Sequence, residues 1–167
     1  KSGTVGGVQL PAGLKEAELR VKVACQEGLL AAACDATADE LAKGLASDHA
    51  FTLQYVITLL GSIQSKKHAD AIAKHVAGND KTAVAALWAL GKIGAGADVI
   101  KPALDRAHLV AATAAEALWR LGDSSGLPLL YKMLEGTNAS IAQERLRAMT
   151  GKDCGTDAAK WKALLEK

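Results

Sequence analysis

The chain has 167 residues, of which 50% are hydrophobic, only 4% are aromatic and 3 are proline. This composition is sufficient for a buried core, which argues against intrinsic disorder, and its many aliphatic residues favour packed helices over a β-sandwich or barrel. The net charge of +2 excludes a strong overall attraction to nucleic acid or to an anionic membrane. No apolar run approaches the roughly 18 residues that a membrane span needs, so we expect a soluble chain.

The N-terminal part is predicted in two pieces. Residues 1–12 are expected to form a flexible lead-in. The chain begins with Lys1 where an initiator Met would stand, so the localisation stays open between the cytoplasm and export after loss of an N-terminal signal segment. Residues 14–34 are interpreted as a degenerate first helical unit, whose apolar positions are filled by Val23, Leu30 and Ala33.

A recurring pattern predicts four helices farther along the chain. Their anchor residues recur after 30, 28 and 28 positions, and a second apolar anchor follows each one three residues later. A small residue four positions before most anchors lets neighbouring helices approach closely. The first anchors are Leu60, Leu90, Leu118 and Leu146, the second are Ile63, Ile93, Leu121 and Met149, and the small residues are Ala86, Ala114 and Ala142.

Second helices are predicted around each of these units, because apolar residues recur there at the spacing of one helical face. The repeated unit is therefore a helix, a turn and a second helix. The apolar positions of the second helices are Leu41 and Leu45; Ala69, Ile72 and Val76; Val99, Ile100 and Leu104; Leu127, Leu130 and Leu134.

Capping signals mark where these helices begin. Thr37 with Glu40 is typical of a capping box before the helix of Leu41, and Ser140 with Gln143 suggests the same for the fourth anchor helix. Asn79-Asp80 is expected to separate two hairpins, and Pro102 and Pro128 to lie in the first turn of their helices. The last helix is expected to be capped by Thr156 or Asp157 and to bury Trp161, Leu164 and Leu165.

The segment from Val110 to Asp123, VAATAAEALWRLGD, resembles the first-helix motif of HEAT repeats, in particular the short type named after phycobilisome lyases. That motif runs approximately V-R-x-A-A-A-E-A-L-G-x-L-G-D. Ala111 replaces its usual Arg, which removes a conventional contact with the preceding repeat, and Trp119 replaces a Gly. The resemblance covers residues 38–151 clearly, and the matching positions are Val110, Ala114, Ala115, Glu116, Ala117, Leu118, Leu121, Gly122 and Asp123.

The resemblance implies an all-α fold, namely a right-handed α-solenoid of about five HEAT-like helical hairpins over residues 13–155. A C-terminal capping helix over residues 156–167 closes it. Second helices line the inner, concave side in families of this kind, so their polar positions are the candidate partner-binding residues. These are Lys67, Asp70, Lys74, Lys101, Asp105, Tyr131, Lys132 and Glu135.

The mixed charge of these positions favours a protein or peptide partner over a phosphate backbone. Tyr131 is the candidate exposed aromatic anchor. Trp88 and Trp119, on first helices, are expected to pack against the next repeat; the alternative is an exposed contact for a partner.

The sequence contains no recognisable motif of a catalytic, metal-binding or cofactor-binding site. Cys25, Cys34 and Cys154 lack metal-ligand spacing, and His68 and His75 stand about two helical turns apart without a third ligand. No nucleophile elbow is present, and the glycines of 91–96 follow a helix where a dinucleotide loop needs a strand. We therefore predict no catalytic residues, metal or cofactor.

The predicted function is a non-enzymatic protein-binding or scaffold module. One alternative is a nucleic-acid-binding array of the same repeat type. Another is a chaperone-like role in attaching or removing a chromophore, which follows only from the resemblance to lyase-type repeats.

Overall fold

The computed structural model describes residues 4–5, 8–9 and 35–166. Thr4–Val5 (β1) and Val8–Gln9 (β2) pair as a short antiparallel ladder. The remainder of the expected lead-in, the first unit at 14–34 and both Cys25 and Cys34 lie outside the described residues. Within the part of the chain that is described, no helix is both long and apolar enough to cross a bilayer.

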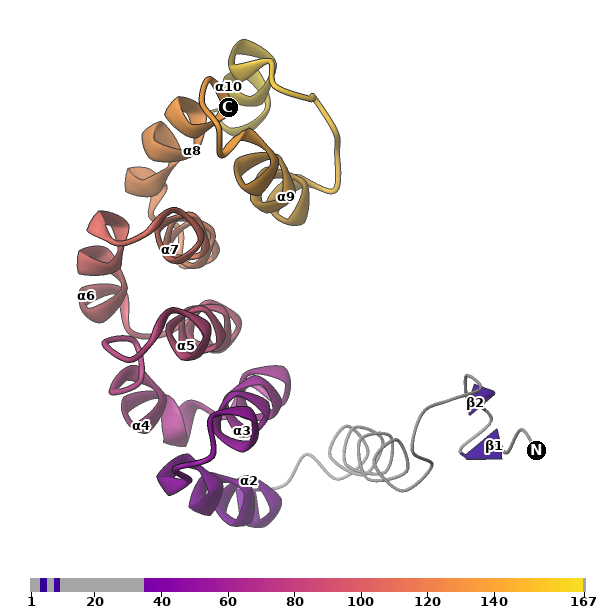
Figure 1. Ribbon diagram of the computed structural model, residues 1–167, viewed down its shortest axis with the longest axis vertical. Helices are drawn as coiled ribbons and strands as arrows, with labels where there is room; N and C mark the ends of the chain where they lie inside the picture. Colours follow the sequence, from indigo (N-terminus) through magenta and orange to yellow (C-terminus); the bar gives the residue numbers. More distant parts are fainter. Residues whose placement is uncertain (1–3, 6–7, 10–34, 167) are drawn as a thin grey trace.

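From residue 35 to residue 166 the described chain is helical, as predicted (Figure 1). Four longer helices alternate with shorter second helices, most of which join an α-helical turn to a 3-10 turn. The first helices are α3 (Ala50–Ser62), α5 (Asp80–Ile93), α7 (His108–Arg120) and α9 (Ala139–Thr150). The second helices are α2 (Asp35–Ala42) with η1 (Lys43–Ala46), η2 (Lys66–His68) with α4 (Ala69–Ala73), α6 (Ala97–Ile100) with η3 (Lys101–Asp105), and η4 (Ser124–Gly126) with α8 (Leu127–Leu134); α10 (Ala158–Leu165) ends the chain.

The helices form two rows, and the stack bends (Figure 1). The first helices α3, α5, α7 and α9 follow one another along the inner side of the bend. The second helices α4, α6 and α8 follow the outer side. The expectation that second helices line the concave side is therefore wrong for this chain, because its first helices are the more closely spaced row.

The predicted anchors hold the first helices together. Leu60, Leu90, Leu118 and Leu146 are completely buried, as are the small residues Ala86, Ala114 and Ala142. Burying one leucine side chain stabilises the fold by about 1.5–3 kcal/mol. The periodicity of the sequence thus identified the interior of the stack.

Two close seams join the first helices. A Cβ atom placed on Gly61 of α3 would lie 2.6 Å from the Cα of Ala89 on α5, and one on Gly91 would lie 2.9 Å from the Cα of Ala117 on α7. Glycine therefore lets the backbones touch at the same position of two successive units. In the next unit the sequence replaces this glycine by Trp119 and the opposing alanine by Arg145.

The helix starts follow the sequence signals only in part. The Asn79 side chain caps α5 by accepting from the Thr82 amide, and Asp157 caps α10 by accepting from the Lys160 amide. Thr37 lies inside α2, and Ser140 lies inside α9 behind Asn138, so both predicted capping boxes are wrong. The two prolines occupy first turns of η3 and α8, as expected.

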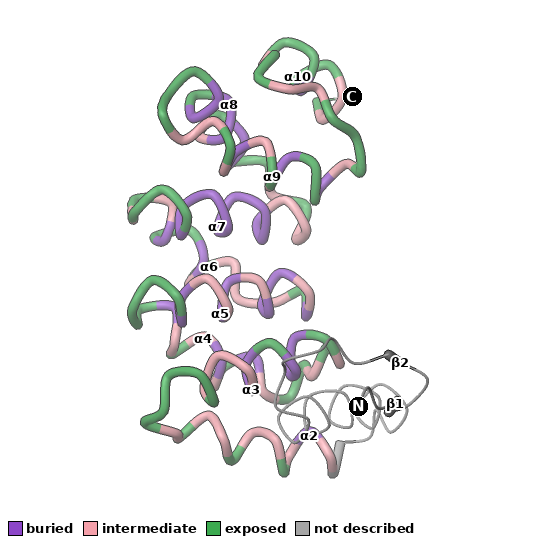
Figure 2. The backbone as a smooth tube through the Cα atoms, turned by 45° about the vertical axis from the view of Figure 1, so that its right-hand side comes forward, coloured by how far each residue is buried: buried purple, intermediate pink, exposed green. Residues whose placement is uncertain are grey.

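The buried side chains divide into two clusters, one from Ala38 to Leu118 and one from Ala112 to Trp161. Helix α7 contributes to both clusters and is buried over most of its length (Figure 2). In the second cluster, α10 inserts Trp161, which is completely buried and donates from Nε1 to the Gly155 carbonyl oxygen at 2.9 Å. The predicted apolar face of α10 is confirmed, since Leu164 and Leu165 pack against the same cluster.

Candidate partner-binding surfaces

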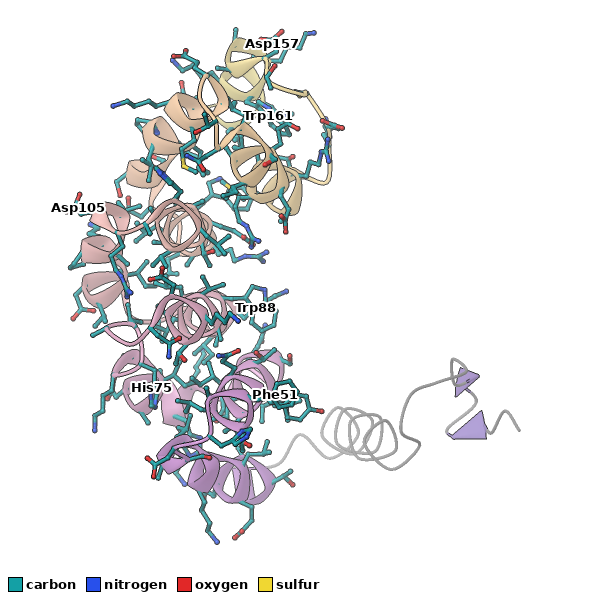
Figure 3. The ribbon with its side chains drawn as sticks, viewed as in Figure 1. Phe51, His75, Trp88, Asp105, Asp157 and Trp161 are labelled. Carbon is teal, nitrogen blue, oxygen red and sulfur yellow. The ribbon has the colours of Figure 1, made fainter. Side chains whose placement is uncertain are left out.

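The predicted partner-binding residues lie on the second helices, along the outer side of the bend. Seven of the eight are exposed: Lys67, Asp70, Lys74, Lys101, Asp105, Lys132 and Glu135. Asp105 points away from the first helices in Figure 3. The sequence therefore located an exposed row correctly, although on the side of the stack opposite to the one expected.

Two of these lysines also connect neighbouring parts of the stack. Lys67 Nζ lies 2.7 Å from Asp39 Oδ2 of α2, and His68 Nε2 lies 3.1 Å from the other oxygen of the same carboxylate. Lys101 Nζ lies 2.9 Å from Asp123 Oδ2, beyond α7. Hydrogen bonds from Ser125, together with Lys101, lower the pKa of Asp123 to about 2. Much of the charge of Lys67 and Lys101 is thus balanced within the chain.

The prediction of Tyr131 as an exposed anchor is wrong, because this side chain is only 5% exposed. Helix α10 packs over it, and Lys162 Nζ lies 5.4 Å from the centroid of its ring. Burial, followed by the nearby Glu166 carboxylate, raises the pKa of Tyr131 to about 12. The side chain therefore belongs to the interface between α8 and α10.

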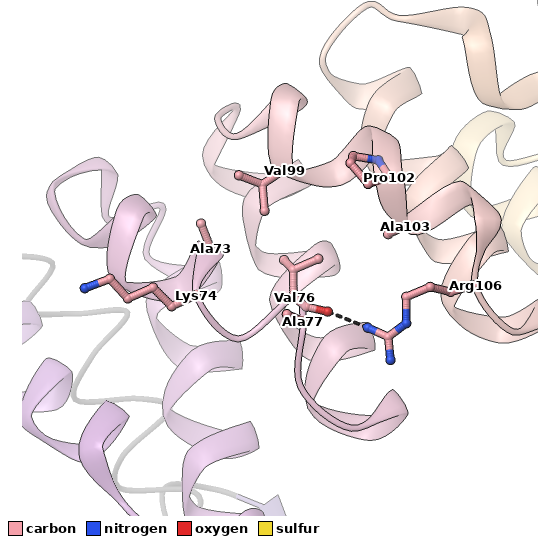
Figure 4. Close-up of a pocket in the computed structure, with 8 residues that line it drawn as sticks. All are labelled: Ala73, Lys74, Val76, Ala77, Val99, Pro102, Ala103 and Arg106. Atoms are coloured by element: carbon pink, nitrogen blue, oxygen red, sulfur yellow. Dashed lines mark hydrogen bonds between the residues drawn. The ribbon is translucent and has the colours of Figure 1, made fainter.

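An open, mainly apolar hollow lies between consecutive second helices, with a volume of about 380 Å³ (Figure 4). Of the predicted residues, only Lys74 lines it, at the rim. Sequence reasoning did not assign the others to a site, because it placed Val76 and Val99 in the buried apolar stripes and because the hollow forms only between two successive second helices. The lining residues are Ala73, Lys74, Val76, Ala77, Val99, Pro102, Ala103 and Arg106.

Arg106 forms one wall of this hollow and fixes its shape. Its guanidinium donates to the carbonyl oxygens of Val76 and, at 2.9 Å, of Gly78, and it forms an ion pair with Asp80 at 2.9 Å. These bonds tie η3 to the turn that precedes α5. They supply a polar connection between two successive pairs of helices.

The inner side of the bend carries aromatic residues. Phe51 and Tyr55 of α3 stack in parallel with ring centroids 6.4 Å apart, and Phe51 and Trp88 both point to this side in Figure 3. Trp88 packs beside Gly61 of the preceding helix, and Lys92 Nζ lies 5.6 Å from its ring centroid. Its expected contact with the next repeat stays a prediction. Trp119 packs against the second cluster as predicted.

A charge cluster replaces the glycine seam between α7 and α9. Glu116 is 2% exposed, and its two oxygens bind different guanidinium groups, Arg120 at 2.7 Å and Arg145 at 3.1 Å. Arg145 also reaches Glu144 at 2.9 Å. This arrangement binds the two helices to each other through groups that neutralise one another.

Comparison with protein-family models gives no match, and comparison with curated proteins gives no significant similarity. Within residues 35–166, no group of three His, Cys, Asp or Glu side chains is arranged to hold a metal ion. The described surfaces offer an apolar hollow beside charged side chains on one row, and the exposed ring of Phe51 with the half-buried rings of Tyr55 and Trp88 on the other. Both are features with which proteins bind other proteins or peptides.

Proposed function

We propose that this chain is a non-enzymatic protein-binding module, built as a right-handed α-solenoid of about five HEAT-like hairpins. The two rows of helices and the recurring Gly-Ala seams support the repeat interpretation. Four hairpin units can be followed through α3, α5, α7 and α9 with their partners, and the fifth would need residues 14–34. Stability of such an array comes mainly from contacts between neighbouring units.

The hollow between α4 and η3 is the observation that carries the proposal. Among its lining residues, Ala77 and Pro102 are exposed and Val99 is half-buried, while Lys74 stands at the rim. Asp70 and Asp105 add exposed charge nearby on the same row. An apolar side chain of a partner can fill the hollow, and polar groups around it can then meet the surrounding charges.

Two substitutions test this site. Ala77→Trp should fill the hollow and Lys74→Glu should reverse the charge at its rim, so each should weaken binding of a partner by about tenfold or more, equivalent to about 1.4 kcal/mol. The ligands are peptides that are selected from a display library for binding to the full chain. Their affinity is measured by fluorescence anisotropy.

Lys152→Glu, an exposed charge reversal in the loop before α10, is the matched control and should leave the affinity unchanged. All variants should keep the melting temperature of the parent. If both hollow variants bind the selected peptides as tightly as the parent does, the second-helix site is wrong.

The same row does not favour nucleic acid. Asp39 and Asp123 already face Lys67 and Lys101, so this surface has little unbalanced positive charge for a phosphate backbone. Duplex DNA at low salt should therefore show no salt-dependent retention on the chain.

A further inference from the structure

The hollow on the outer row has two walls, one from each of two consecutive second helices. Residues 66–77, which comprise η2, α4 and the turn after them, form the first wall. Residues 97–106, which comprise α6, η3 and Arg106, form the second wall. Each wall contributes four of the eight lining residues. The charge on each wall therefore determines which partner can enter the hollow.

Three basic side chains of the walls are already balanced within the chain. Each forms an ion pair with a carboxylate from another element. These pairs are Lys67 with Asp39 at 2.7 Å, Lys101 with Asp123 at 2.9 Å and Arg106 with Asp80 at 2.9 Å. Burial, followed by the neighbouring Lys74, lowers the pKa of His75, so this imidazole is neutral near pH 7. None of these groups adds unbalanced charge to the walls.

Five further charged side chains of the walls are exposed and form no ion pair among the residues that the structure describes. The first wall carries Lys66, Asp70 and Lys74, which leaves one surplus positive charge. The second wall carries Asp98 and Asp105, which leave two negative charges. The two walls of the hollow therefore differ in sign.

These charges flank the apolar lining. Lys74 lines the hollow, and its side chain extends from α4 away from the second wall (Figure 4). Asp98 and Asp105 stand about one helical turn before and after Pro102, which lines the second wall. Asp105 also points away from the first helices in Figure 3. A partner that fills the hollow from outside therefore meets an ammonium group on one side and carboxylates on the other.

We propose that the hollow selects a peptide segment in which one large apolar side chain stands between an acidic and a basic residue. This partner class rests on the proposed function, because it concerns the same site. The apolar side chain fills the hollow, the acidic residue meets Lys74, and the basic residue meets Asp98 or Asp105. The opposite walls fix the direction in which the segment crosses the helices, because the reverse direction brings like charges together.

An extended segment fits this arrangement. Alternate side chains of an extended chain point to the same side, and the residues two positions before and after the apolar one are about 13 Å apart. Neighbouring packed helices lie about 8–10 Å apart, and Lys74 reaches outward beyond the first wall. The expected pattern is therefore an acidic residue, any residue, a large apolar residue, any residue and a basic residue, in either chain direction.

A segment with charge of one sign fits less well. A purely acidic segment gains Lys74 but faces Asp98 and Asp105 across the hollow. A purely basic segment gains these two carboxylates but faces Lys66 and Lys74. Like charges brought together at an interface oppose binding, so each of these segments should bind more weakly than the mixed one.

The test uses the full chain and a display library of about twelve-residue peptides. Selection should enrich peptides with the mixed pattern, and one of them is then measured by fluorescence anisotropy. Lys74→Glu should weaken its binding about tenfold at low salt, because an attraction becomes a repulsion. Asp98→Asn combined with Asp105→Asn should weaken it about threefold, because attractions are lost and none is reversed.

A charge exchange identifies the contact with Lys74. The same peptide with its acidic residue replaced by lysine should bind the parent about tenfold more weakly, and it should bind Lys74→Glu nearly as tightly as the original peptide binds the parent. A general effect of charge would not restore binding in this combination. Lys132→Glu reverses another exposed lysine of the outer row, and this matched control should change neither affinity.

Ala77→Trp separates the failure of this inference from the failure of the site. If the selected peptides lose binding with Ala77→Trp but lack the mixed pattern, or if the exchanged peptide does not regain affinity for Lys74→Glu, the hollow stands and the partner class is wrong. If no peptide is enriched, or if the selected peptides bind Ala77→Trp as tightly as the parent, the hollow is not the site and both proposals are overturned.

Discussion

Helix α7 carries leucine at a buried position and at an exposed one. Leu118 is completely buried, whereas Leu109 is 43% exposed. Truncating a buried leucine removes its transfer free energy and leaves a cavity. Leu118→Ala should therefore lower the free energy of unfolding by about 2–5 kcal/mol, measured by urea denaturation.

The comparison within α7 keeps the residue type and the helix constant. Leu109→Ala should change the free energy of unfolding by less than about 1 kcal/mol, because its side chain is already largely hydrated. Equal effects of the two substitutions would mean that Leu118 does not occupy the interior position assigned to it.

Tyr131 gives the fold a dependence on alkaline pH. Its pKa in the folded chain is about 12, above the ordinary value of 10.0, so the unfolded chain loses this proton first as the pH rises. Deprotonation then favours the unfolded state, and the free energy of unfolding should fall between about pH 10 and pH 12. Tyr131→Phe should reduce this fall.

Tyr55→Phe serves as the control, because Tyr55 and Tyr131 are the two tyrosines of the chain. Lysines titrate in the same range, so the measurement is the difference between the variants in thermal unfolding at each pH. An identical alkaline loss in parent and Tyr131→Phe would show that the Tyr131 hydroxyl does not contribute.

At the scale of elements, the glycine seams determine how closely the first helices pack. Gly61→Ala places a methyl group 2.7 Å from the Cβ of Ala89, so α3 and α5 must separate. The gain in helix propensity, up to about 1 kcal/mol, opposes this strain. We expect a net loss of about 1–3 kcal/mol in the free energy of unfolding, measured by chemical denaturation.

Gly136 provides the matched control, since a Cβ there would meet only the Met133 carbonyl oxygen, at 3.8 Å. Gly136→Ala should leave the stability unchanged or slightly higher. A stability gain for Gly61→Ala as large as that for Gly136→Ala would contradict the close backbone contact.

The sequence predicted the helical elements well because their information is local. Leucines at positions 60, 90, 118 and 146 repeat with one spacing, and each proved to be buried. The capping signals at Thr37 and Ser140 failed, since a polar residue inside the first turns of a helix has the same local pattern as a cap.

The sites were predicted less well because they depend on contacts between elements. The residues around Tyr131 in the sequence give no indication that α10, about thirty residues later, packs over its side chain. The hollow is formed by small residues of two successive second helices, and no single helix shows it. The row of helices that lies inside the bend is likewise determined by the spacing between helices. The periodicity of residues within one helix contains no information on that spacing.

At the scale of the whole molecule, the two rows place two different surfaces on opposite sides of one stack (Figure 1). The outer row offers an apolar hollow with charges of both signs, and the inner row carries the exposed ring of Phe51 and the half-buried ring of Trp88. A partner bound in the proposed site at the hollow would leave the inner row uncovered.

The two Gly-Ala seams have a consequence for the length of the molecule. Gly61 meets Ala89, and Gly91 meets Ala117, at equivalent positions of successive units. A duplicate of residues 80–107 inserted after residue 107 would present Ala89 again to Gly91, and Gly91 again to Ala117. Growth by gene duplication therefore needs no new complementary surface, and the number of units in such a chain is open to evolutionary change.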